Sequence, residues 1–218
     1  MSATETGSSP VPPNSRASYM DDFLSSPLPS STTSEILGNA STELKEIAVK
    51  WYFLFRSSGS DFGKTCSELK VTEVWVQDHV DSEDIGAQNE SVEERVRRGH
   101  PTGQREVKMV AEVEVKPEMC DGEGYLHNGC MALIIDEGSA IALLVHKVLE
   151  GGRNIIGVSQ NINILYHAPA PVGTRLRIVN RSVTTAGVLG TCRSDIWDKD
   201  TNRLIATGLQ SQADRNNV

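Results

Sequence analysis

Two carboxylates, Asp136 and Glu137, stand in the middle of a strongly apolar stretch, residues 126–145, which reads LHNGCMALIIDEGSAIALLV. A helix that is apolar on most sides belongs inside a protein. Burying an ionised carboxylate among apolar groups costs free energy, so such a group is expected to be paired, hydrogen-bonded or needed for chemistry. Asp136 is therefore the first candidate for a residue that takes a proton from water or attacks a substrate. Glu137 lies about 100° from it around a helix, and we expect it to pair with a basic group.

The start of the same helix offers a second chemical group. Backbone N–H groups in a first helical turn have no partner within the helix and carry partial positive charge, which suits a developing oxyanion. Asn128 and Asp136 are eight residues apart, or about 12 Å of helical rise. One chain cannot bring both to one carbonyl, whereas two chains with facing helices can. Small residues near Asp136 permit such an approach: Ala132, Ser139 and Ala140.

The other elements follow from hydrophobic periodicity and turn residues. Helices are predicted at 41–56 and 129–148, the second ended by Gly151 and Gly152, and residues 117–125 are predicted as a loop. The order of elements indicates an α+β fold, an antiparallel sheet of five to six strands wrapped around one long central helix. The predicted strands are 69–80, 105–115, 155–166, 174–184, 188–198 and 203–212.

The composition changes along the 218 residues. The first 41 are rich in Ser, Thr, Pro, Asn and Gly and have few large apolar side chains. We therefore predict a disordered Ser/Pro-rich tail at 1–40 and a single folded domain at 41–214. The charged, apolar-poor segment 81–104 is predicted as an insertion. It lies at the tip of a hairpin if the strands on either side of it pair.

The charge excludes some partners. A net charge of −8 argues against general nucleic-acid binding, which needs a basic surface. A membrane-spanning helix at 126–145 is rejected because His127, Asp136 and Glu137 would be costly there. A ligand that carries phosphate groups would need basic side chains. The candidates for that role are Arg153, Arg175, Arg177, Arg181 and Arg193.

Cysteine usage and the N-terminal residues bear on the compartment. The four cysteines show no CxxC motif and no metal-ligand spacing, which indicates reduced, mostly buried thiols in an intracellular protein. They are Cys66, Cys120, Cys130 and Cys192. No secretory signal is visible, and a single basic residue, Arg16, precedes Ser41, which argues against a mitochondrial presequence. We predict a cytoplasmic protein.

Several motifs resemble those of hotdog-fold acyl-CoA thioesterases, in particular the phenylacetyl-CoA thioesterase-like branch. That branch has a Leu-His-Gly-Gly loop and an aspartate nine residues after the histidine, and Asp136 lies nine after His127. Gly157-Val158-Ser159 resembles the Gly-Val-Ser that opens the next strand. Tyr166, Pro169 and Ala170 match a later Tyr-x-x-Pro-Ala stretch, and residues 203–208 resemble the closing strand. The resemblance covers about residues 65–212.

The resemblance implies an enzyme of lipid metabolism that hydrolyses acyl-CoA to free acid and CoA without a metal or an organic cofactor. It implies a homodimer, or a dimer of dimers (a homotetramer), with active sites across the dimer interface. By the same resemblance, Asp136 is general base or nucleophile and Ser159 holds the attacking water. The backbone amide of Asn128 polarises the thioester carbonyl, and His127 orients the loop or the substrate.

Two positions depart from the family pattern. Asn128 stands where the family has glycine, and Asp121 falls where this branch often has asparagine. The resemblance places Asp121 and Gly129 at the bound substrate. A carboxylate at Asp121 would repel a thioester oxyanion, so these departures leave open a second reading.

That reading is a hotdog protein that binds acyl-CoA or acyl-carrier protein without turning it over. A third is a hotdog dehydratase or hydratase, which also uses histidine and a carboxylate. The spacing of His127 and Asp136, together with Ser159, fits hydrolysis better. A serine hydrolase is excluded because the chain has no Gly-x-Ser-x-Gly elbow.

Overall fold

The computed structural model describes residues 20–57, 64–78, 105–185 and 189–214. Its strands form one antiparallel six-stranded sheet in the order β1-β2-β4-β5-β6-β3. Each lies where the sequence predicted one, with ends shifted by at most three residues. The strands are β1 Lys70–Asp78, β2 Arg105–Glu114, β3 Val158–Tyr166, β4 Arg175–Thr184, β5 Leu189–Asp198 and β6 Arg203–Ala213.

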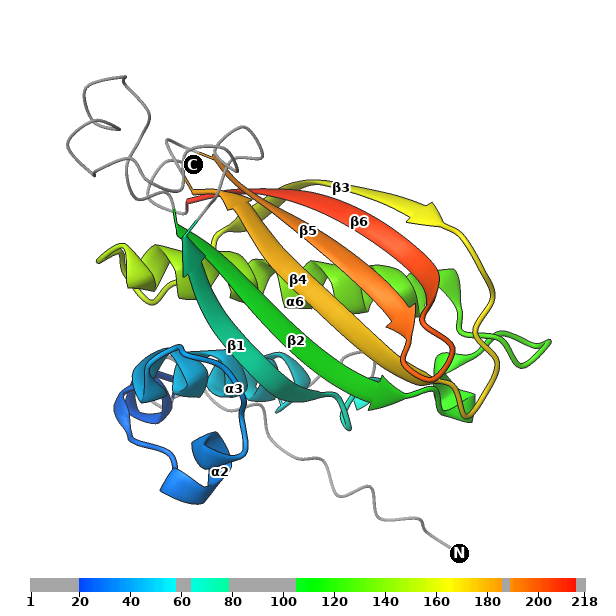
Figure 1. Ribbon diagram of the computed structural model, residues 1–218, viewed down its shortest axis with the longest axis horizontal. Coiled ribbons are helices and arrows are strands. Elements are labelled where there is room, and N and C mark those ends of the chain that lie inside the picture. Colours follow the sequence, from blue (N-terminus) through cyan, green and yellow to red (C-terminus); the bar gives the residue numbers. More distant parts are fainter. Residues whose placement is uncertain (1–19, 58–63, 79–104, 186–188, 215–218) are drawn as a thin grey trace, which may run out of the picture.

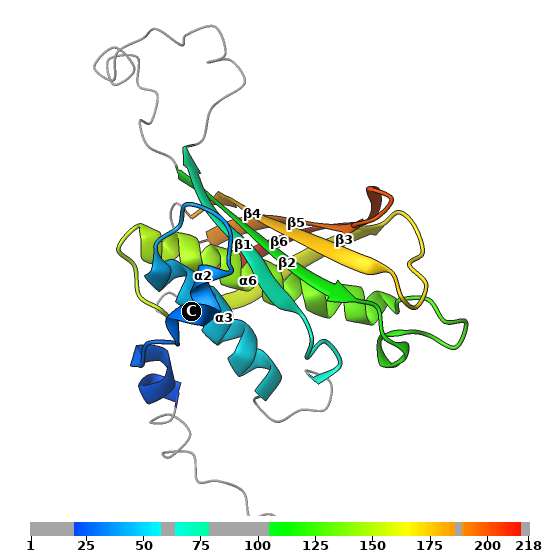
Figure 2. The same ribbon diagram turned by 60° about the horizontal axis from the view of Figure 1, so that its bottom comes forward.

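One long helix, α6 (Asn128–Leu149), runs along one face of this sheet (Figure 1). A second helix, α3 (Thr42–Ser57), lies on the same side of the sheet, beside α6 and β1 (Figure 2). Fully buried apolar side chains such as Ile134 and Ile141 join α6 to the core. This arrangement confirms the predicted α+β class and the hotdog fold.

Local chemistry explains where α6 begins and ends. His127 caps its first turn, and Gly151, with a φ of 81°, follows its last residues in the left-handed conformation that glycine tolerates. Near the middle of α6, the helix approaches β6 closely at Gly208. A Cβ atom added to that glycine would lie 2.5 Å from Ile135 Cγ2. Only a residue without a side chain fits there.

The predicted disorder of residues 1–40 is wrong for the part that the structure describes. Residues 20–25 are helical, α2 spans Ser30–Ser34, and Ile36 and Ala40 are buried. Leu37 pairs with β1, where its N–H donates to Thr72 O at 2.9 Å. Burial against α3 and the edge of β1 offsets the chain entropy that the polar composition alone leaves uncompensated. Residues 1–19 lie outside the described residues.

The hairpin that the sequence predicted on the condition that the strands before and after residues 81–104 pair is present. β1 and β2 pair antiparallel as far as Asp78 and Arg105, which form the described end of this hairpin. The predicted insertion at 81–104 itself lies outside the described residues. A short 3₁₀ turn, η2 (Pro117–Met119), occupies the start of the predicted loop at 117–125.

The cysteines lie largely as the sequence predicted. All four are free thiols, and all but Cys120 are buried. Within the described ranges, no helix has the length and apolarity needed to cross a membrane.

The two edges of the sheet differ. Along β1, Leu37 and Ala40 bond to the strand backbone, and the Asn39 side chain bonds both the N–H and the C=O of Val76. Along β3, all residues but Ile164 are exposed, and in the described part of the chain only β6 pairs with this strand. An exposed, unpaired strand edge is a ready template for another strand. The edge that lies near Asp136 is therefore the one left open.

Candidate functional site

Asp136 lies half-buried on α6 and faces two neutral donors from the sheet. Ser159 Oγ, on β3, donates to Asp136 Oδ1 at 2.9 Å. Gln210 Nε2, on β6, donates to the same Oδ1 and also to Ser159 Oγ, the latter at 2.9 Å. The structure thus brings together Asp136 and Ser159, two residues that the family resemblance assigned to one site. It adds Gln210, which sequence reasoning missed.

The sheet register explains why these side chains meet. Ser159 lies opposite Gln212 in the β3–β6 pair, which makes Gln210 its diagonal neighbour on the same face. The register shifts between Ser159 and Asn161, so one extra residue of β3 has no partner on β6. Such a bulge re-aims the side chains beside it. Here it lies next to Ser159.

The start of α6 leaves one backbone donor free. His127 Nδ1 accepts a hydrogen bond from the N–H of Gly129 at 3.0 Å, and the C=O of His127 accepts from Cys130. The N–H of Asn128 has no acceptor among the described residues. Because Nδ1 accepts, a neutral His127 carries its proton on Nε2. His127 therefore fixes the first turn, and Asn128 presents the open N–H.

The remaining predicted residues lie in the loop before α6 or at its start. Asp121 Oδ1 accepts from the backbone N–H groups of Glu123 and Tyr125, at 3.0 and 3.1 Å. This carboxylate thus shapes the loop, and its contact with substrate stays a prediction. Gly129 uses its N–H on His127, so it is not the free donor.

Glu137 has the basic partner that the sequence called for. It is buried, and Arg56 Nη2 on α3 donates to its Oε2 at 2.7 Å. Arg56 also donates from Nε to the C=O of Cys66, so the pair ties α3 and the start of the β1 segment to α6. Burial raises the pKa of Glu137 to about 7. The positive charge of Arg56 acts to lower this pKa, and the negative charge of Asp136 acts to raise it. Glu137 is thus part of the structural support rather than of the reacting site.

We expect the Arg56→Met variant to lose about 3–5 kcal/mol of unfolding free energy at pH 8, because it leaves a buried charge unpaired. The raised pKa means that the folded state binds more protons than the unfolded state between pH 4.5 and about 7. The contribution of Glu137 to stability therefore falls as pH rises through that window, and the defect of the variant shrinks on acidification. Urea unfolding at pH 8 and pH 5 measures both effects.

The double variant Arg56→Met, Glu137→Leu is the control, because it removes both charges and should recover most of the loss. A single Arg56→Met variant as stable as the wild type at pH 8 would contradict this account of the pair.

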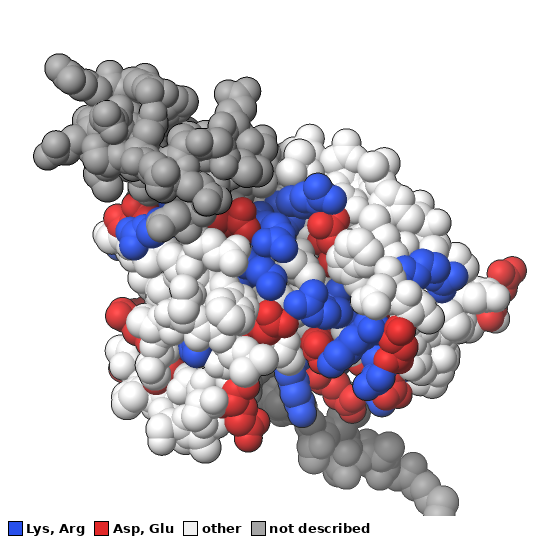
Figure 3. Space-filling view, in the orientation of Figure 1, with Lys and Arg blue, Asp and Glu red and all other residues white. Residues whose placement is uncertain are grey.

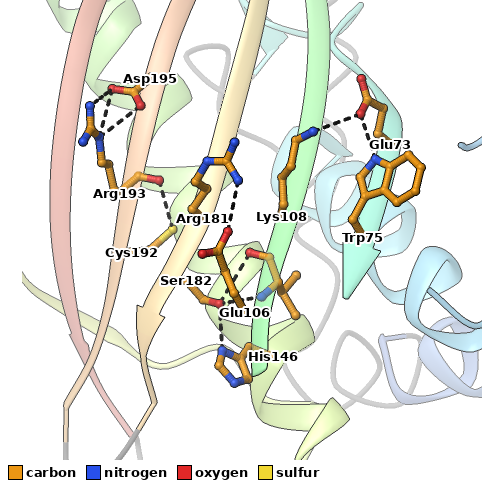
Figure 4. A network of polar contacts seen from close by, with 11 residues as sticks. Glu73, Trp75, Glu106, Lys108, His146, Arg181, Ser182, Cys192, Arg193 and Asp195 are labelled. Atoms are coloured by element: carbon orange, nitrogen blue, oxygen red, sulfur yellow. Dashed lines mark hydrogen bonds and ion pairs between the residues drawn. The ribbon is translucent and has the colours of Figure 1, made fainter. Parts of the chain in front are cut away.

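The arginines considered for CoA phosphates mostly have acidic partners. Basic and acidic side chains alternate over the outer face of the sheet (Figure 3). Arg181 pairs with Glu106 and Arg193 with Asp195, as Figure 4 shows. Arg175 pairs with Asp200 and Arg177 with Glu73. Of the five candidates, Arg153 alone is exposed without an ion pair to any described residue.

Within the described ranges, no three His, Cys, Asp or Glu side chains are grouped to hold a metal ion. A cavity of about 550 Å³ lies between α2, α3 and β1. Its lining includes Phe53 and Arg56 but none of Asp136, Ser159 or Asn128. The candidate site instead lies beside the open edge of β3.

Comparison with known proteins identifies the family of this chain. A family model described as the thioesterase superfamily matches residues 123–205. Over 105 residues, 48% of this chain, the sequence is 33% identical to human acyl-coenzyme A thioesterase 13, of which the match covers 71%. The chain belongs to the thioesterase superfamily. The mouse acyl-coenzyme A thioesterase 13 is 31% identical over the same length.

A solved structure supports the fold of this superfamily member. The crystal structure of zebrafish thioesterase superfamily member 2 superposes with a TM-score of 0.52, at 21% identity, over 74% of this chain and 91% of that one. The sequence motifs around His127, Asp136 and residues 203–208 therefore identified the correct family.

Proposed function

We propose that this chain is an acyl-CoA thioesterase, which converts an acyl-CoA and water into a free acid and CoA. The observation that carries the proposal is the Asp136 carboxylate with Ser159 beside it, held through Oδ1 by neutral donors. No described cation pairs with Asp136, and its Oδ2 has no partner among the described residues. A carboxylate so placed can act as a base. The names of the curated relatives supply the substrate class.

In the proposed reaction, Ser159 Oγ holds the attacking water and Asp136 Oδ2 takes its proton. The water oxygen bonds to the thioester carbon, and the negative charge that develops on the carbonyl oxygen is stabilised by the N–H of Asn128. The C–S bond then breaks, and the proton passes to the sulfur of CoA. Direct attack by Asp136 on the carbonyl, with water entering in a second step, is the alternative use of the same oxygen.

A dimer through β3 would complete this site. The start of β3 contacts Asp136 through Ser159, whereas its end contacts the start of α6, where Tyr166 Oη donates to Asn128 O at 3.3 Å. If two β3 strands pair antiparallel about a two-fold axis, the start of one lies beside the end of the other. Asp136 of one chain then approaches Asn128 of the second chain. This arrangement supports a homodimer or a dimer of dimers.

The Ile162→Lys variant is expected to be monomeric and to lose most of its activity. Ile162 lies at the centre of β3, and a two-fold axis there would place two lysines near one another in the interface. The matched control is Val183→Lys, which adds the same charge at an exposed apolar residue of β4. Sedimentation velocity and release of CoA measure the two effects. An active dimer of the Ile162→Lys variant would contradict the β3 interface.

Release of the free CoA thiol from short, long and aromatic acyl-CoAs tests the proposed function. Turnover of at least one of these substrates is the expected result. If none is turned over but an acyl-CoA raises the melting temperature, the chain is a binding protein instead. The residue that favours this second function is Asn128, which replaces the family glycine beside the carbonyl. Cytoplasmic localisation and a role in lipid metabolism remain predictions.

A further inference from the structure

Gln210 is a fully buried polar residue beside the reacting carboxylate. Burying an amide is unfavourable unless its hydrogen bonds are made. The described hydrogen bonds of this amide all go to Asp136, Ser159 or Ser139. Its Nε2 donates to Asp136 Oδ1 and Ser159 Oγ, and its Oε1 accepts from Ser139 Oγ at 2.6 Å.

These partners fix which way the amide points. A carboxylate oxygen can only accept, so the atom that faces Asp136 Oδ1 must be the NH₂ group. The carbonyl oxygen then faces Ser139, whose one hydroxyl proton has this oxygen and the C=O of Ile135 among its acceptors. With the amide in this orientation, Ser159 Oγ accepts from Gln210 and donates its own proton to Asp136. The hydrogen bonds from Gln210 through Ser159 to Asp136 therefore have one direction of donation.

We propose that Gln210 is a positioning residue of the active site, which holds Asp136 through Oδ1 so that Oδ2 is the oxygen that takes the proton from water. The inference rests on the proposed function. It adds that Ser159 keeps a lone pair directed at the water, because its proton is committed to Asp136. Gln210 touches neither the water nor the thioester in this scheme, and it acts through Asp136 and Ser159.

The packing around Gln210 supports this role. Ser139 lies one helical turn after Ile135, and Ile135 fills the space beside Gly208, two residues before Gln210 on β6. The close approach of α6 to β6 at Gly208 sets the distance between the two elements. Gln210 can then reach Asp136 and Ser139 at once, since both lie on the face of α6 that meets β6.

The Gln210→Met variant tests the proposal, because methionine has a similar length but donates no hydrogen bond. We expect kcat to fall by about 10- to 100-fold with little change in KM, since a misplaced base slows the chemical step.

The matched control is Gln212→Met, the same substitution two residues further along β6. Gln212 is also buried, but its Nε2 has no partner among the described residues. The control should leave kcat unchanged. Equal losses of kcat in both variants would overturn the positioning role.

A second readout needs no turnover. The side-chain carboxyl carbon resonance of Asp136, recorded by NMR at one fixed pH, should differ from the wild type in Gln210→Met and coincide with it in Gln212→Met. If the wild type releases no CoA, the proposed function fails, and this resonance still decides whether Gln210 acts on Asp136. The same resonance position in all three proteins would reject the inference.

Discussion

The Asp136→Asn variant is expected to lose at least ~10²-fold in kcat, because general-base catalysis by a positioned side chain contributes about 10²- to 10⁴-fold. The asparagine amide fills nearly the same space but cannot take a proton from water. The half-buried position of Asp136 and its neutral partners mean that no buried cation loses its counter-charge. Release of CoA under saturating substrate measures the effect, and the melting temperature should change little.

Asp200→Asn is the matched control for the loss of one carboxylate. Asp200 pairs with Arg175 in an exposed turn between β5 and β6, far along the chain from α6. Full activity of this variant and a large loss in Asp136→Asn are the expected pair of results. A fall in kcat of less than about threefold in Asp136→Asn would be too small for a general base.

The Asn128→Pro variant is expected to lower kcat by about 10²- to 10³-fold, the usual effect of removing one oxyanion donor. Proline deletes the backbone N–H that has no acceptor in the described structure. Asn128 is the first residue of α6, a position where proline is well tolerated. His127, with a ψ of 138°, already has the extended conformation required before proline. The helix should therefore form normally.

Two variants at the same position separate the backbone from the side chain. Asn128→Ala and Asn128→Gly keep the N–H and should keep most of the activity, and the glycine variant restores the family residue. Steady-state kinetics of the three variants, with thermal melts to check folding, measure the difference. If proline and alanine lower kcat equally, the side chain of Asn128 rather than its N–H matters.

The sequence singled out Asp136 as an aspartate within a long apolar run, and the family resemblance added Ser159 on a later strand. The structure brings these two side chains together, and their catalytic roles stay predictions. Both residues lie where their local patterns put them, because α6 and β3 are strongly specified elements. The packing of β3 and β6 beside α6 then follows from the family fold.

Gln210 could not be found in the same way. In β6 the inward face carries Gly208 and Gln210, whereas the apolar Leu209 between them is 47% exposed. Hydrophobic alternation alone would place Leu209 in the core. Instead the polar amide of Gln210 lies inside, because it has buried hydrogen-bond partners, and Leu209 lies on the outer face of the sheet. Such partners are visible only once α6 and β6 are side by side.

At the N-terminus, composition alone predicted too little order. It predicted disorder up to residue 40, but a few apolar side chains, Ile36 among them, are buried against α3 and β1.

The partner of Glu137 was predicted only as a basic group. Arg56 comes from 81 residues earlier in the chain, a distance that no local pattern reveals.

The most direct test of the account is subunit complementation between the Asp136→Asn and Asn128→Pro chains. Each homodimer should be nearly inactive. If the active site combines Asp136 of one chain with Asn128 of the other, each heterodimer has one intact site. Random pairing of equal amounts makes half of the dimers heterodimers, so the co-expressed mixture should show about a quarter of wild-type CoA release. Activity no higher than that of the separate variants would contradict a site shared between two chains.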